Sequence, residues 1–178
     1  FFSTTLPSPP SGLGRQEAKP QTKEASIVIV ESFLAYAHIM AFLMLATFMT
    51  SETALCRAEW VNPAVVRRLV WVNVLSLVSG ALVLLTGLAR TFWGVKGVAW
   101  YWAQPLLHTK ITLLVAMLAL LVLAARQYRA WRHELDAQGS LPSPEALRRT
   151  RKLVMWSAHL MVVVALLAVF LARGVGTR

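Results

Sequence analysis

Cysteine is almost absent from this sequence, in which Cys56 is the single one. One cysteine excludes an internal disulfide and any cysteine-rich metal site. The sequence also lacks a glycine-rich phosphate loop, a nucleophile elbow and a paired acidic motif. Common kinase and hydrolase chemistry therefore has no support among the motifs.

Charged residues are missing from three long stretches, 32–51, 69–89 and 153–172, and a fourth apolar run covers 111–125. Charged residues make up 15% of the chain and hydrophobic ones 57%, against about 25% and roughly 45–50% in soluble domains. A helix that crosses a bilayer needs about 20 mostly apolar residues, and these runs lack the polar face of a soluble bundle. The sequence therefore predicts an all-α, integral membrane four-helix bundle over 26–174. The expected helices cover about 30–54, 65–90, 104–128 and 146–172.

Residues 1–25 differ in composition from the rest of the chain. They are rich in Pro, Ser, Gly and Thr, which predicts a polar, extended tail. Because the sequence begins with Phe1 rather than methionine, it is compatible with a processed targeting peptide upstream. Before the fourth apolar run, Ser143 and Pro144 are typical of an N-cap and a first helical position, so this helix is expected to begin in the aqueous phase.

Basic residues outnumber acidic ones, with 18 Lys and Arg against 8 Asp and Glu. In a membrane protein such residues set the orientation and meet anionic lipid headgroups. No nucleic-acid motif accompanies them, so we expect the lipid bilayer as a partner and no nucleic acid. The densest short loop, 126–152, is expected to face the cytoplasm of a bacterial cell, with both termini outside the cytoplasmic membrane. Its basic residues are Arg126, Arg129, Arg132, Arg148, Arg149, Arg151 and Lys152.

The segment 88–110, LARTFWGVKGVAWYWAQPLLHTK, gathers aromatic rings and positive charge between the second and third expected helices. Trp and Tyr concentrate where acyl chains meet headgroups, which indicates an interfacial anchor. Arg90, Lys96 and Lys110 lie on the side where cations are expected to be fewer, and the next helix start favours an anion. Two interpretations stay open: the cations bind carboxylates or phosphates, or they extend to lipid headgroups.

Small and polar residues form a stripe on the second expected helix. Asn73, Gly80 and Gly87 recur at heptad spacing, with Ser76 close to the same stripe. In lipid, small residues let helices approach and polar ones bond across them, so the stripe is expected to face the bundle interior. Glu52 ends the first expected helix and is expected to pair with Arg67 or Arg68.

Several of these residues belong to a pattern that resembles a family of small bacterial membrane proteins with four helices, catalogued as predicted membrane proteins of unknown function. The pattern consists of His38, Glu52, Arg67–Arg68, Gly87, Arg90, Lys96–Gly97, Tyr101, Pro105 and Lys110. It covers roughly 33–172 and is most specific over 87–110. The chain departs from the family at Asn73, where the family favours Asp, at Gln104, where it favours Asn, and near Ala124, where a proline is missing.

The architecture is also distantly similar to HemJ-type protoporphyrinogen oxidases and to copper-resistance membrane subunits. This likeness implies that His38 and Lys110 carry the function, since a histidine in the first helix and a basic residue in the third are shared.

Histidines within a bilayer span are costly and are therefore functional candidates. With about 1.5 Å of rise per residue, His38 and His108 lie at similar depth and form the better-matched pair of axial ligands for haem b. His159 would serve instead if the fourth helix is shifted, whereas His133 is expected to be solvated in the charged loop. The simpler alternative for each is a hydrogen bond to a neighbouring helix.

Two functions from different classes follow, and the sequence does not decide whether the protein is an enzyme. The first is a haem-binding redox protein in which His38 is the metal ligand. The second is an accessory or structural subunit of a larger membrane complex, as the small-residue stripe and the polar tail suggest. The expected cofactor-binding residues are His38, His108, His159, Arg90, Lys96 and Lys110.

Overall fold

The computed structural model of the protein describes residues 18–93 and 97–174, and most of them are helical. The elements are α1 (Ala18–Leu55), a short 3₁₀ helix η1 (Ala58–Trp60), α2 (Pro63–Trp93), α3 (Val98–Trp102), α4 (Pro105–Gln138) and α5 (Pro144–Ala172). No strand occurs in the two described ranges. The predicted all-α class is confirmed.

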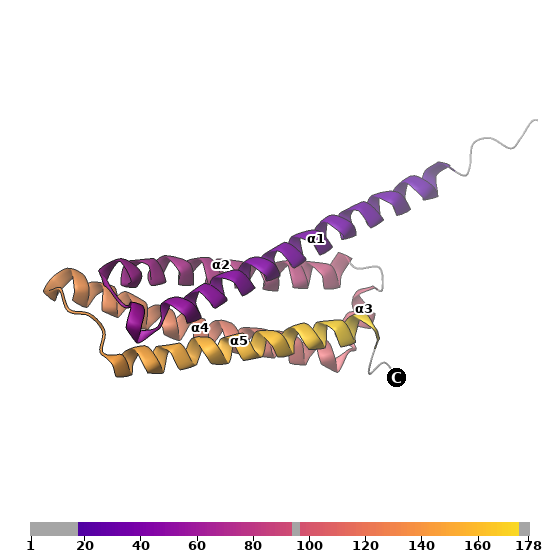
Figure 1. The fold of residues 1–178 in the computed structure, drawn as a ribbon. Coiled ribbons are helices and arrows are strands. Elements are labelled where there is room, and N and C mark those ends of the chain that lie inside the picture. The colour runs from indigo at the N-terminus through magenta and orange to yellow at the C-terminus, as the bar shows by residue number, and fades with distance from the viewer. Residues whose placement is uncertain (1–17, 94–96, 175–178) are drawn as a thin grey trace, which may run out of the picture.

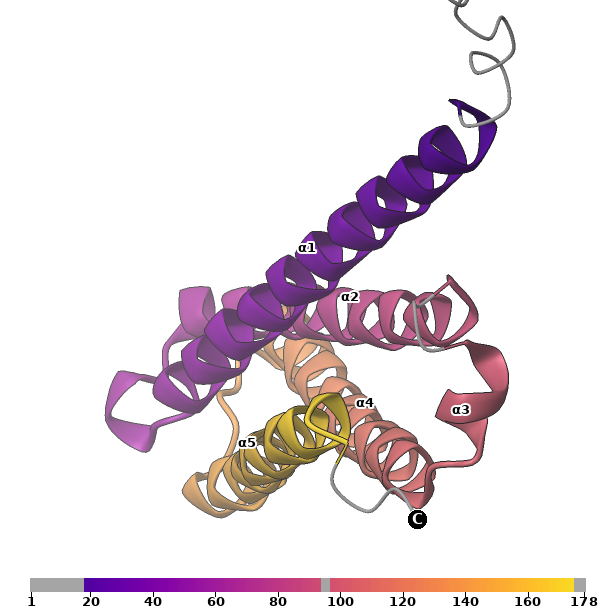
Figure 2. The same ribbon diagram turned by 90° about the vertical axis from the view of Figure 1, so that its right-hand side faces the viewer.

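Four of these helices, α1, α2, α4 and α5, are long and apolar enough to cross a membrane. Successive long helices run in opposite directions, as Figures 1 and 2 show. Large apolar side chains such as Trp71, Leu85 and Val162 point outward and are 62–66% exposed. In a protein with no water around its flanks, such residues contact acyl chains, so the predicted four-helix membrane bundle is confirmed.

The bundle has two ends, which are named here by the short helices that close them (Figure 1). The η1 end carries η1 and the loop between α4 and α5. The α3 end carries α3, the C-terminal end of α5 and the N-terminal half of α1, which leans away from the other helices. This lean separates α1 from α5 at the α3 end.

The helix boundaries differ from the expected ones at two places. α1 begins at Ala18 rather than near residue 30, so only residues 1–17 of the expected tail lie outside the described part. α4 continues to Gln138 rather than stopping near 128, because its last turns are amphipathic and bury Trp131 and Leu135 while charged side chains stay exposed.

The ends of α4 and α5 are set by local chemistry. Gly139 follows α4 with a φ of 70°, a left-handed conformation that suits glycine, and its N–H donates to the Leu135 carbonyl. The Ser143 side chain accepts from the Ala146 N–H at 3.2 Å, and Pro144 occupies the first helical position. The expected N-cap of the last helix is confirmed.

The bundle interior has two apolar clusters. One lies toward the η1 end and includes Val66, Tyr128 and Val154, and the other lies toward the middle and includes Leu45 and Met117. Asn73, Ser76 and Gly80 are buried inside the bundle, as expected for the small-residue stripe. Close packing of α2 on its neighbours therefore depends on these small side chains.

Candidate functional site

A cleft of about 560 Å³ lies at the α3 end and is called here the α3-end cleft. Every helix except η1 contributes to its lining. Its size falls within the range of about 300–1,000 Å³ that small-molecule sites occupy. The lining residues used below are Glu31, His38, Gly87, Arg90, Thr91, Tyr101 and Lys110, and the α5 side is apolar with Ala165, Ala168 and Val169.

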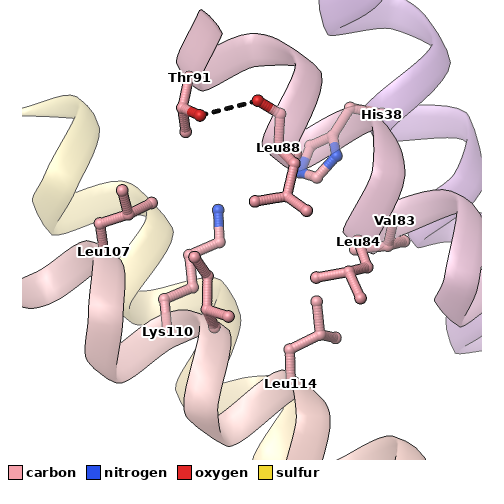
Figure 3. Close-up of a pocket in the computed structure, with 10 residues that line it drawn as sticks. His38, Val83, Leu84, Leu88, Thr91, Leu107, Lys110 and Leu114 are labelled. Carbon is pink, nitrogen blue, oxygen red and sulfur yellow. Dashed lines mark hydrogen bonds between the residues drawn. The ribbon is translucent and has the colours of Figure 1, made fainter. Parts of the chain in front are cut away.

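A smaller cavity of about 20 Å³ shares part of this lining and lies between α2 and α4. Figure 3 shows the Lys110 side chain extending into it between Leu107 and Leu88, with the imidazole of His38 on the far side. A space of this size holds about one water molecule. The ammonium of Lys110 and the ring of His38 therefore belong to one site although they come from different helices.

His38 is held by α2. Its Nδ1 lies 2.8 Å from Thr86 Oγ1, and Thr86 Oγ1 also donates to the Leu82 carbonyl at 2.6 Å. A hydroxyl has a single hydrogen, so with that hydrogen on Leu82 the Thr86 oxygen accepts from a protonated Nδ1. The neutral ring then has its lone pair on Nε2.

Glycine at position 87 lets the imidazole approach α2. A Cβ placed on Gly87 would lie 3.2 Å from Cε1 of His38, which is tighter than ordinary contact. The close approach fixes the ring between α1 and α2, beside the cleft. The stripe of small residues on α2, which was predicted to face inward, thus leaves room for the His38 ring at Gly87.

Arg90 and Lys110 are partly buried cations in the same lining. Both ion pairs between described residues involve Asp136, at the opposite end of the bundle. Among the described residues, Arg90 and Lys110 therefore have no carboxylate partner within 4.0 Å. Glu31 is the acidic residue of the lining, so the cleft carries a net positive charge. An anionic group would offset this charge.

The structure separates the other expected site residues from this cleft. His108 is exposed, its Nδ1 lies 3.1 Å from the Gln104 carbonyl, and its ring packs against Trp102. His159 is exposed on α5, with Nδ1 2.6 Å from the Met155 carbonyl. Lys96 lies outside the described residues. Of the expected set, His38, Arg90 and Lys110 are brought together.

Three polar residues of this site were not expected from the sequence: Thr86, which bonds His38, and Glu31 and Thr91, which line the cleft. Thr86 was overlooked although it precedes Gly87 on the interior stripe. Glu31 lies a heptad before His38, which places both on one face of α1. Thr91 closes the set, with its Oγ1 donating to the Leu88 carbonyl at 2.8 Å. Heptad spacing counted from His38 would have identified Glu31.

A second polar cluster, called here the Glu52 cluster, consists of Glu52, Asn73 and Ser76. Glu52 is fully buried, and its carboxyl is bonded to Asn73 at 3.2 Å and to Ser76 at 2.5 Å. The expected pairing of Glu52 with Arg67 or Arg68 is wrong, since Arg67 bonds Asp136 instead and Arg68 is exposed. Glu52 faces inward because α1 still packs on α2 at this turn.

The comparisons with known proteins add a family and no function. The chain has no significant match among curated proteins or among solved structures. It does match the family described as "Predicted membrane protein (DUF2214)" over residues 30–176, which agrees with the four apolar helices. This integral membrane protein therefore belongs to the DUF2214 family of predicted membrane proteins.

Proposed function

We propose that the α3-end cleft binds an amphiphilic molecule with acidic groups, and that haem b is the ligand that uses all of its features. The observation that carries the proposal is the joint lining of one cleft by His38, Arg90 and Lys110. Apolar walls suit a large hydrophobic body, and two cations without a carboxylate partner suit its acidic groups.

His38 supports the choice of haem over other amphiphilic acids. Its Nδ1 is directed to Thr86, and a hydrogen bond at one ring nitrogen orients the other for metal binding. In this assignment Nε2 of His38 would hold the iron, and Arg90 and Lys110 would bind the propionates. Bound haem supplies one-electron chemistry, which makes the protein a membrane redox carrier.

The two other candidate histidines, His108 and His159, bear on how many iron ligands this chain would supply. His108 and His159 lie outside the cleft lining and are exposed. The proposal therefore uses one histidine of this chain as an iron ligand, rather than the pair that the sequence favoured. Both residues then serve as matched controls, since each is a histidine of a membrane-spanning helix.

The test is the absorption spectrum of the detergent-purified protein, with haemin added. We expect a Soret band that His38→Ala removes and that His108→Ala and His159→Ala retain. Arg90→Ala and Lys110→Ala should weaken haem binding by about 10- to 100-fold each, because a charge-assisted contact contributes about 1.5–3 kcal/mol. A wild-type protein that stays colourless contradicts haem. If anionic lipid then co-purifies and is lost in Lys110→Ala, the amphiphile is a lipid.

A role as an accessory or structural subunit is the second candidate, and one observation favours it. The N-terminal half of α1 leans away from the bundle (Figure 2), and Ile27, Val28, Ile29 and Val30 are 48–58% exposed there. Lipid covers such a surface equally well, so a partner has to be demonstrated. Fixed stoichiometric partners in a mild-detergent purification, lost when Ile27 and Val30 are changed to Ser, support this role. A lone monomer under the same conditions contradicts it.

A further inference from the structure

Glu52 is an ionisable side chain that the cleft does not use. It lies on the last turns of α1, toward the η1 end, and 0% of its surface is exposed. Asn73 and Ser76 of α2 close over it and are themselves 1% and 0% exposed. Asn73 also donates to the Leu121 carbonyl of α4 at 3.3 Å, so three helices enclose the carboxyl.

No cation neutralises this carboxyl among the residues that the structure describes. Lys, Arg and His nitrogens all lie beyond 4.0 Å from it, since both ion pairs found there involve Asp136. The Cys56 thiol just after α1 and the Tyr128 hydroxyl on α4 interact electrostatically with Glu52, and Arg151 of α5 interacts with Cys56. An unpaired carboxylate in an apolar interior costs far more than a neutral carboxylic acid.

The hydrogen bonds of Ser76 indicate where the proton lies. Ser76 Oγ is 2.5 Å from Glu52 Oε1 and 3.1 Å from the Val72 carbonyl. Both neighbours are acceptors if Glu52 is ionised, and the single hydroxyl hydrogen of Ser76 serves one of them. With a proton on Oε1, Glu52 donates to Ser76, Ser76 donates to Val72, and Asn73 donates to Oε2 at 3.2 Å. Each of these bonds then has one donor and one acceptor.

We propose that Glu52 is a proton-binding site in the bundle interior, occupied by an exchangeable proton when the Glu52 cluster has the geometry seen here. Loss of that proton leaves a carboxylate with two donors and no counter-ion. The protein then has to admit water or a cation between α1 and α2. Proton release is thereby linked to loosening of the α1–α2 packing, whatever ligand the α3-end cleft binds.

Infrared spectroscopy of the purified protein at pH 7 tests the site, with the spectrum of each variant subtracted from that of the wild type. We expect the C=O stretch of a protonated carboxylic acid in the wild type, lost in Glu52→Gln and unchanged in Glu59→Gln, whose carboxyl lies on the exposed η1 turn. Glutamine has the shape of the neutral acid and retains the bonds to Ser76 and Asn73. A spectrum without this band, or a band that Glu52→Gln leaves in place, overturns the proposal.

A second measurement on the wild type does not depend on the variant folding. Hydrophobic carbodiimides react with protonated carboxyls in apolar surroundings, and peptide mapping locates the adduct. We expect the adduct on Glu52 rather than Glu59, with its yield falling as the pH rises. An adduct confined to Glu59 and the other exposed carboxyls overturns the proposal.

Discussion

At the residue scale, two sets of hydrogen bonds between polar side chains connect the otherwise apolar helices. His38 bonds Thr86 across α1 and α2 at the α3 end, and Glu52 bonds Asn73 and Ser76 across the same two helices toward the η1 end. Interhelical bonds of this kind contribute about 0.6 kcal/mol on average in membrane proteins. Their stabilisation is modest, so we attribute their main importance to ligand and proton binding.

The single cysteine provides a test at the same scale. Cys56 follows the membrane-spanning part of α1 and is 1% exposed, and burial raises the pKa of its thiol to about 11. At pH 8 roughly 0.1% of such a thiol is thiolate, against about a quarter of an ordinary thiol with a pKa of about 8.5. A membrane-permeant maleimide should therefore label the folded protein about 200-fold more slowly than the unfolded protein in SDS.

The pH dependence of this labelling has a definite sign. Because the thiolate is the reactive form and the folded pKa is about 11, the rate should still rise about tenfold per pH unit between pH 8 and 10. Equal labelling of the folded and SDS-treated protein would contradict the burial of Cys56.

At the element scale, the starts of α2 and α5 are defined by polar caps rather than by hydrophobicity. Asn62 Oδ1 accepts from the Val65 N–H at 2.9 Å before α2, and Ser143 has the same role before α5. Both helices have proline at their first position. α5 thus begins in the charged segment, before the apolar run enters the lipid.

Removal of the Ser143 cap should destabilise α5. Ser143→Ala leaves the Ala146 N–H without its side-chain partner, which costs about 1 kcal/mol. The thermal unfolding midpoint in detergent should fall by about 2–4 °C for a chain of this size. Ser140→Ala, in the exposed loop before it, is the matched control and should leave the midpoint unchanged. An equal effect of both substitutions would show that the cap contributes nothing.

Much of this architecture could be predicted because helix length and polarity are local properties of the sequence. The four apolar runs, the Ser143 cap and the inward direction of Asn73 and Gly80 all follow from spacing along one helix. Spacing along one helix does not show which side chain of a neighbouring helix a given side chain contacts. Glu52 was assigned to Arg67 or Arg68 by charge alone, but the rotation of α1 turns it toward Asn73. His108 was matched to His38 by depth, but depth does not fix the face on which a side chain lies.

At the scale of the whole molecule, the lean of α1 creates the α3-end cleft. Toward the η1 end α1 packs on α2 through Glu52 and Met49, which are 0% and 1% exposed, whereas Phe33 and Tyr36 near its other end are 72% and 63% exposed. The small residues Ala165 and Ala168 of α5 form the facing wall. A ligand of the kind proposed above would therefore enter a site that is bounded by helices and by lipid.

The orientation of the bundle decides from which compartment such a ligand would come. The loop between α4 and α5 at the η1 end is strongly basic and is predicted to face the cytoplasm. We expect an impermeant maleimide added to intact cells to label Ala99→Cys on α3 and to leave Ser140→Cys in the loop unlabelled. Both positions are exposed, so both should react after lysis, and the buried Cys56 keeps the background low. If only Ser140→Cys is labelled in intact cells, the predicted orientation is reversed, and the α3-end cleft lies on the cytoplasmic side.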